Sequence, residues 1–184
     1  LQGGAADATP IARLRDVGLE FQLGDAQNAI SLTMQAGRGE LLGAALRWER
    51  LFWQGATAGG AAQLDIQAEL EPIVVAPLLA RAQPSFGWRG DLRVAGRIAV
   101  RSAPQVEVDV VLERQGGDLS VTDETGTQAL QLTDLRLALN AKDGQWNFTQ
   151  ALAGKTLGVA AGAVSARLPP GQRWPDARTP IQGV

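Results

Sequence analysis

The sequence contains no cysteine, no histidine and no tyrosine in its 184 residues. Their absence excludes Ser-His-Asp and Cys-His nucleophile systems, thiolate redox chemistry, disulfide bonds, and zinc sites built from histidine or cysteine. Aromatic residues make up only 5% of the chain, which is little for a protein that stacks sugars or nucleobases. No run of about 18 apolar residues is present, so we expect no membrane span in this segment.

The charge balance also argues against nucleic acid as a partner. With 17 basic and 19 acidic residues the net charge is -2, which provides no electrostatic basis for binding nucleic acid. Hydrophobic residues make up 45% of the chain, enough for a folded domain. The length favours a single unit. The sequence starts at Leu1 and ends in what reads as the beginning of a strand, so we expect an internal piece of a larger protein.

Apolar and polar residues alternate along most of the chain, the period of a strand with one buried and one solvated face. The pattern is clearest at residues 63–70, 92–101 and 105–113. Strands at the centre of a parallel sheet would be continuously apolar, and short turns separate these runs. Asp143-Gly144 is the strongest hairpin signal. The pattern therefore predicts an antiparallel meander.

Three segments interrupt the alternation. The apolar phase slips by one residue near Thr133-Asp134, which a β-bulge would absorb. Residues 74–83 contain Pro77 and are followed by Pro84, so we predict a helix of about two turns there. Residues 169–180 form a Pro-rich connection.

Several motifs have simple structural explanations. Residues 154–156, GKT, lack the earlier glycine of a phosphate loop, and residues 37–43, GRGELLG, miss the dinucleotide fingerprint by one position. We predict turns between strands at both places. Asp118, Asp123 and Glu124 could form a carboxylate pair for glycoside hydrolysis, but acidic residues beside Gly126 are also typical of turns.

Three arginines occupy the polar positions of one predicted strand, and three carboxylates occupy those of the next. We expect cross-strand ion pairs rather than a basic binding stripe. The residues are Arg93, Arg97, Arg101, Glu107, Asp109 and Glu113.

The aliphatic positions of the strands remain as the candidate functional surface. Patterning alone leaves open whether a second sheet covers them in a sandwich, the sheet closes as a barrel, or it curls and leaves a groove. The candidate groove residues are Leu64, Ile66, Leu70, Leu92, Val94, Ile98, Val100, Val106, Val108, Val110, Leu112, Leu135, Leu137 and Leu139.

Several stretches resemble the TamB family of AsmA-like proteins from Gram-negative cell envelopes. They share ladders of leucine alternating with polar residues, ended by Asp-Gly and an aromatic residue. The stretches are LRWE at 46–49, LFWQG at 51–55, the ladder at 130–139, DGQWNF at 143–148, and Gly154 with LGV at 157–159. The resemblance covers most of the chain, except the helix expected around Leu78 and Leu79.

The resemblance implies an internal periplasmic segment of a protein anchored in the inner membrane. It implies a long β-ribbon folded into a trough, or β-taco, with an aliphatic interior. The parent protein would partner an outer-membrane barrel of the TamA type in a translocation and assembly module. The implied roles are assembly of outer-membrane proteins such as autotransporters, and phospholipid movement between the two membranes.

We therefore expect residues 1–184 to form a single all-β segment, an elongated curved antiparallel sheet with an aliphatic concave groove and one short helix. The expected function is a non-enzymatic periplasmic conduit or chaperone, without cofactor or metal, that carries phospholipid or nascent outer-membrane β-strands. The alternative is a closed β-sandwich that serves as a structural or protein-interaction module. A third hypothesis is a carboxylate enzyme that uses Asp118, Asp123 or Glu124.

Overall fold

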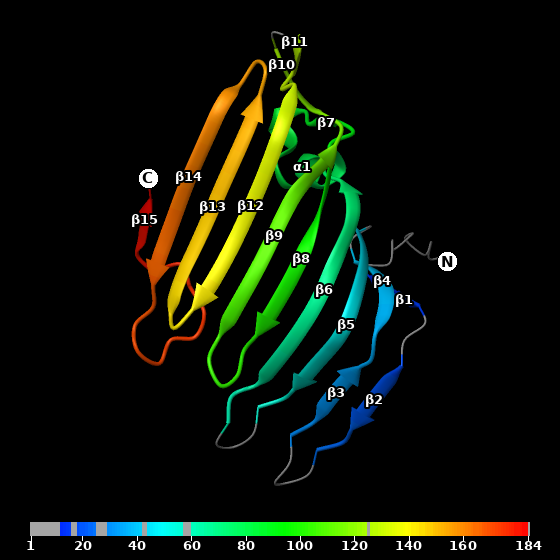
Figure 1. The fold of residues 1–184 in the computed structure, drawn as a ribbon, viewed down its shortest axis with the longest axis vertical. Coiled ribbons are helices and arrows are strands. Elements are labelled where there is room, and N and C mark those ends of the chain that lie inside the picture. Colours follow the sequence, from blue (N-terminus) through cyan, green and yellow to red (C-terminus); the bar gives the residue numbers. More distant parts are fainter. Residues whose placement is uncertain are drawn as a thin grey trace, which may run out of the picture.

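The computed structural model describes residues 12–15, 18–24, 29–41, 44–56, 60–124 and 126–183. The expected all-β fold is confirmed: one large, curved antiparallel sheet and one short helix make up most of the chain (Figure 1). The sheet has twelve strands and is open, since its end strands β1 and β15 are separated by the rest of the sheet.

The large sheet is a meander in which most strands pair with their neighbours in sequence. Along the sheet the order is β1, β4, β5, β6, β8, β9, β12, β13, β14, β15, with β3 pairing β5 beside β4 and β2 pairing β3. The bounds are Ala12–Arg15 for β1, Leu19–Gln22 for β2, Ser31–Met34 for β3, Gly37–Leu41 for β4, Ala44–Gln54 for β5, Gln63–Val74 for β6, Arg93–Arg101 for β8, Glu107–Gly116 for β9, Leu132–Lys142 for β12, Gln145–Gly154 for β13, Gly158–Arg167 for β14 and Ile181–Gly183 for β15.

Smaller elements cluster at one end of the sheet. Helix α1 (Ala76–Ala82) and the 3-10 helix η1 (Pro84–Phe86) connect β6 to β7 (Arg89–Gly90). Strand β7 pairs with β10 (Leu119–Asp123), which pairs with β11 (Gly126–Ala129). We call this the α1 end of the sheet. The opposite end, where the β8–β9 and β12–β13 hairpins turn, also carries the connection at residues 168–180, and we call it the loop end (Figure 1).

Local sequence signals explain how the meander turns. Asp143 and Gly144 both adopt positive φ, at 52° and 74°, as expected for the type I′ turn between β12 and β13. The expected β-bulge is confirmed by a register shift between Leu132 and Asp134. Residues 155–157 form the expected turn between β13 and β14.

The turn predicted at residues 37–43 is wrong over its described part, because Gly37–Leu41 forms β4. Gly37 lies opposite Trp48 of β5, and a Cβ at Gly37 would come within 2.8 Å of Cζ2 of that indole. The Trp48 Nε1–H donates a 2.8 Å hydrogen bond to the Gln35 carbonyl oxygen. The glycine therefore makes room for the indole within a strand.

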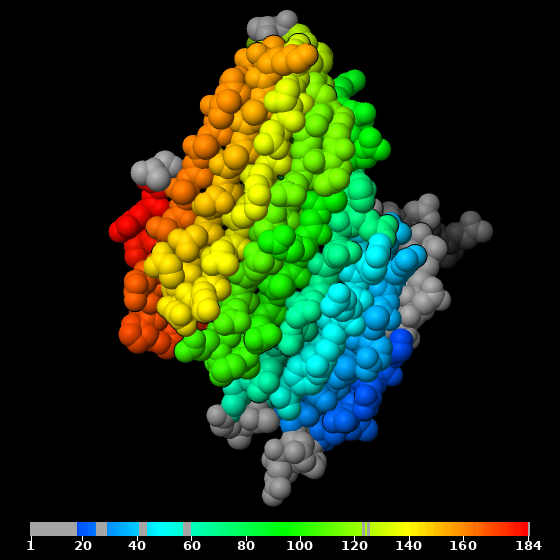
Figure 2. All heavy atoms as spheres, in the orientation of Figure 1, coloured from blue at the N-terminus to red at the C-terminus, as the bar shows by residue number. Residues whose placement is uncertain are grey.

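The open sheet exposes far more surface than a compact monomer. Its accessible surface is 12593 Å², whereas a compact monomer of this length exposes about 8,500 Å². In Figure 2 the face turned away from α1 is a continuous layer of neighbouring strands, from the N-terminal strands in blue to β15 in red. Among the described residues, the only other sheet is the three-stranded one at the α1 end, so no second sheet closes this fold as a sandwich.

Gly96 provides a test of the central strand pairing. A Cβ on Gly96 of β8 would collide with the Val111 carbonyl oxygen of β9. We expect Gly96→Ala to lower the free energy of unfolding by about 1–3 kcal/mol, because the overpacked strands must separate. Denaturant titration measures the change. Gly183→Ala is the matched control, since its Cβ would make only ordinary contacts at 3.6 Å. Equal stability of the two variants would contradict the close approach of β8 and β9.

Candidate functional site

Strand register assembles one continuous aliphatic surface, which we call the apolar face. Ile66, Val100 and Val108 are consecutive partners across β6, β8 and β9. In the next row Ile98 lies opposite Val110, and Val110 lies opposite Leu139 of β12. A third row holds Leu70, Gly96, Leu112 and Leu137. Alternation within each strand places the remaining strand residues of the predicted groove, Leu64, Val94 and Leu135, on the same face.

The α1 end of the apolar face is covered. Ala76 of α1, Leu92, Leu119 and Leu132 form a buried cluster, with Leu92 only 1% exposed. Leu135 and Leu152 of the sheet pack against this cluster, together with Leu79 of the helix. Hence α1 lies over the apolar face at this end. Leu92, predicted as a groove residue, is instead a core residue beneath the helix.

The loop end is covered by the connection after β14. Leu168 forms a second buried cluster with Val108, Ala141 and Trp146, and Val106 packs against it. The rings of Trp146 and Trp174 lie 5.7 Å apart, which places the connection against the apolar face. Within the connection, the Asp176 backbone N–H donates to Thr179 Oγ1 at 2.9 Å. This local bond fixes the turn that folds back toward the sheet.

Between these two covers the apolar face is partly exposed. Ile98, Leu112 and Leu137 are half-buried, and so are Val110 and Leu139, which border the loop-end cluster and pack against it. Farther along the sheet Phe148 of β13 and Val164 of β14 are paired across the strands and are 36% and 37% exposed. The middle of the face therefore presents aliphatic side chains to solvent over many neighbouring strands.

Sequence reasoning missed several members of this face. Trp48 and Leu51 of β5, and Trp146, Phe148 and Leu152 of β13, share it by register but were absent from the predicted set. The same alternation that marked the central strands runs through residues 46–54 and 145–154. The signal was present, and following the alternation into the neighbouring strands would have found them.

The opposite face is polar and carries ion pairs. Arg97 pairs with Asp109 at 3.4 Å and Arg101 with Glu107 at 3.4 Å, as predicted. The expectation for Glu113 is wrong, because its partner is Arg136 of β12 at 3.3 Å and not an arginine of β8. Glu113 lies directly opposite Arg136 in the register, whereas the bulge at Arg93/Val94 shifts Arg93.

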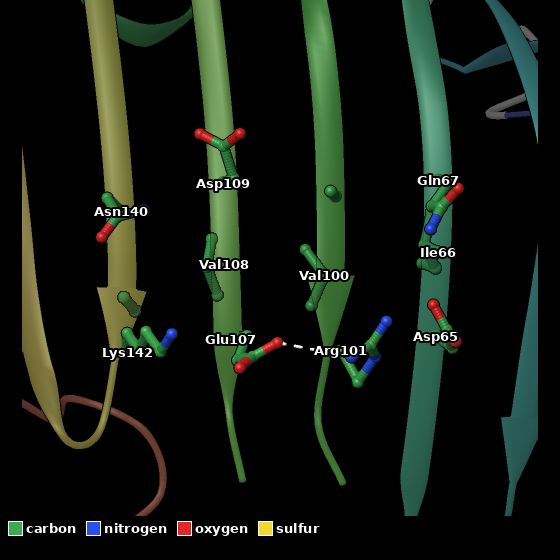
Figure 3. Close-up of a pocket in the computed structure, with 12 residues that line it drawn as sticks. Asp65, Ile66, Gln67, Val100, Arg101, Glu107, Val108, Asp109, Asn140 and Lys142 are labelled. Atoms are coloured by element: carbon green, nitrogen blue, oxygen red, sulfur yellow. Dashed lines mark hydrogen bonds and ion pairs between the residues drawn. The ribbon is translucent and has the colours of Figure 1, made fainter.

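A shallow pocket of about 230 Å³ lies on the polar face. Figure 3 shows its carboxylates and cations on the neighbouring strands β6, β8, β9 and β12, with a dashed line joining Arg101 and Glu107. The polar groups that line it include Asp65, Asp109, Asn140 and Lys142. Opposite charges lie side by side there, and exposed pairs of this kind contribute about 0–1 kcal/mol each. We interpret this pocket as part of the solvated face.

The carboxylate of Asp118 has a structural role. It accepts hydrogen bonds from the backbone N–H groups of Gln131 at 3.0 Å and Leu132 at 2.9 Å. Burial acts to raise the pKa of Asp118, but the backbone N–H groups and nearby Arg114 outweigh it and hold this pKa below its ordinary value. The geometry ties β10 to the start of β12. Glu124 is exposed in the β10–β11 turn, and the side chain of Asp123 lies outside the described part.

Within the described ranges, no three side chains of the Asp, Glu, His or Cys type are arranged to hold a metal ion. The described helices are all too short or too polar to cross a membrane.

The hydrogen bonds to Asp118 predict a pH-dependent contribution to stability. Because the folded pKa is lowered, this contribution is present above about pH 3.8 and lost as the pH falls through the lower folded value. We expect Asp118→Asn to lower the free energy of unfolding by about 1 kcal/mol at pH 7, with the difference shrinking below pH 3.8. Urea titrations across pH measure this. Asp134→Asn is the control with little effect at pH 7, because Asp134 is exposed and belongs to none of the ion pairs found among the described residues. Unchanged stability of Asp118→Asn at pH 7 would contradict the role.

The fold and the apolar face were compared with known proteins. No protein-family model, no curated protein and no solved structure matches this chain.

Proposed function

We propose that this chain is a non-enzymatic segment of a periplasmic conduit, in which the apolar face carries the acyl chains of phospholipid between the inner and outer membranes. The observation that supports this proposal is the partly exposed middle of the apolar face. There, Ile98, Val110, Leu112, Leu137 and Leu139 are half-buried and aliphatic, and the described strands place no charged side chain among them.

Hydrophobic chemistry favours acyl chains as the ligand. Exposing a methylene group to water costs about 0.8 kcal/mol, which an aliphatic surface relieves without fixing the chain in one position. The seven strands from β5 to β14 span about 29 Å at a strand spacing of about 4.8 Å. The hydrocarbon core of a bilayer, about 30 Å thick, holds two acyl chains end to end, so one chain spans about 15 Å. An acyl chain that lies across the strands therefore covers about half of this width.

The resemblance to the TamB family supplies the cellular setting of the proposal. It supports a location in the periplasm of a Gram-negative bacterium, within a protein anchored in the inner membrane. Through that parent protein the segment acts with an outer-membrane barrel of the TamA type. The period-two ladders and the Asp143-Gly144 hairpin carry this resemblance.

A nascent outer-membrane β-strand is the second candidate cargo, and one observation favours it. The short strand β15 pairs only with Val164, Ser165 and Ala166 of β14. In the described part of the chain, residues 158–163 of β14 have no strand on that side, and they contain no charged side chain. An uncharged open edge can accept an extended polypeptide by β-augmentation.

Paired photocrosslinking tests the proposal. A photoreactive residue such as p-benzoylphenylalanine replaces Ile98 or Leu137 on the exposed middle of the apolar face. The controls carry it at Ala99 or Ala138, the next residues along the same strands, which face the polar side. Val94 and Val108 are poor positions, because they are only 6% and 5% exposed.

Each protein is irradiated with vesicles that contain radiolabelled phospholipid. We expect label at positions 98 and 137 and little at 99 and 138, because only the apolar face shelters acyl chains. Equal labelling of both faces, or none, would overturn the lipid proposal. Crosslinks from the apolar face to an outer-membrane polypeptide would support the second cargo. Crosslinks only within the chain or to a second copy would favour a structural or interaction module.

A further inference from the structure

One cation lies on the apolar face at its α1 end. In the described strands of the large sheet, Arg114 of β9 is the single charged residue whose register places it on this face. It follows Leu112 by two positions and lies opposite Val94 of β8. The other arginines and lysines of the central strands, such as Arg97 and Arg136, lie on the polar face in ion pairs or facing solvent. Arg114 is therefore an exception to the pattern.

Only some of the N–H donors of the Arg114 guanidinium have a hydrogen-bond partner. Its Nη2 donates a 2.8 Å hydrogen bond to the Gly117 carbonyl oxygen, while its Nε is buried without a hydrogen-bond partner. None of the ion pairs found among the described residues includes Arg114. The nearby carboxylate of Asp118 accepts the backbone N–H groups of Gln131 and Leu132 instead.

A partly buried cation with an unpartnered donor is costly in an apolar setting. The cost is offset when an anion lies beside the guanidinium and accepts its accessible terminal N–H groups. A guanidinium presents its donors as a planar fork that matches the oxygens of a phosphate or carboxylate. Arg114 also lies where the exposed aliphatic surface meets the cluster under α1, whose members Leu132 and Leu135 belong to the adjacent strand.

We propose that Arg114 binds the phosphate-type anionic head group of an amphiphile whose alkyl chain lies on the apolar face. This inference rests on the proposed function and adds a head-group site to it. The head group accepts hydrogen bonds from the terminal N–H groups of the guanidinium that Gly117 leaves free, and the chain extends from there across Leu112 and Leu137. An amphiphile would therefore be oriented, with its charged group at the α1 end.

Calorimetric titration of the whole 184-residue chain tests this site. The probes are n-dodecyl phosphate and n-dodecyl maltoside, which share one alkyl chain, and inorganic phosphate, which has none. Because a charge-assisted hydrogen bond is stronger than a neutral one, we expect dodecyl phosphate to bind at least about tenfold more tightly than the maltoside. Inorganic phosphate alone should bind far more weakly than dodecyl phosphate.

Variants separate the head-group site from the apolar face. Arg114→Gln should lose the roughly tenfold preference for dodecyl phosphate and still bind the maltoside, which also shows that the variant is folded. Arg114→Lys, which keeps the charge without the fork, should retain part of the preference. Arg97→Gln removes one positive charge from the polar face and should keep the full preference.

The outcomes distinguish the two proposals. If both amphiphiles bind wild type equally and Arg114→Gln changes neither, the head-group site is overturned while the proposed function stands. If neither amphiphile binds wild type, both fail. If inorganic phosphate binds as tightly as dodecyl phosphate, the site takes a free anion, and the inferred amphiphile site is overturned.

Discussion

Pairing between strands that are neighbours in sequence is the constraint on which the whole structure depends. Among the described residues, the only other sheet is the short one at the α1 end, so most of the large sheet is stabilised by ladder hydrogen bonds and by cross-strand side-chain contacts. Most of this pairing comes from ladders between long strands, for example between β5 and β6 and between β12 and β13. The ion pairs on the polar face, Arg101 with Glu107 and Arg136 with Glu113, lie directly across from each other and agree with the same register.

The helix and the connection that cover the two ends of the apolar face remove part of its aliphatic surface from water. They leave the middle of the face accessible. Helix α1 buries Leu92 and Leu132 at one end, and the connection after β14 buries Trp146 and Leu168 at the other. Together they remove the ends of the aliphatic surface from water and leave its middle open. A continuous apolar surface that stays partly exposed is typical of a surface with a ligand or partner, which is the physical basis of the proposed lipid conduit. Arg114 lies at the border of the cover formed by α1, and in the inferred site it orients an amphiphile with its head group at that end.

Much of the fold could be predicted from the sequence, because period-two alternation and turn chemistry are local signals. The Asp143-Gly144 turn, the bulge before Asp134 and the helix bounded by Pro77 and Pro84 all follow from backbone preferences of one or two residues. The errors have non-local causes. The Gly37 strand depends on the indole of Trp48, and the partner of Glu113 depends on a strand that lies more than twenty residues later.

The sequence could predict which aliphatic residues share the apolar face, but not which of them the connecting segments cover. Alternation identified Ile98, Val110 and Leu139 as one face, since side-chain direction follows directly from strand geometry. It did not indicate that Leu92 would be covered by α1 and Leu139 left half-exposed, because coverage depends on where the connecting segments fold. The same alternation reaches Arg114, whose position on the apolar side follows from Leu112 two residues before it.

The sequential strand order has an architectural consequence. Each central strand contacts mainly the strands before and after it, and both covers arise from connections between adjacent strands, α1 between β6 and β8 and residues 168–180 between β14 and β15. Such a fold is nearly one-dimensional, like a solenoid whose units contact only their neighbours. A hairpin inserted between two central strands would lengthen the aliphatic surface by about 10 Å without altering either cover. The architecture is therefore extensible, and the length of the surface is set by the number of hairpins rather than by the size of a core.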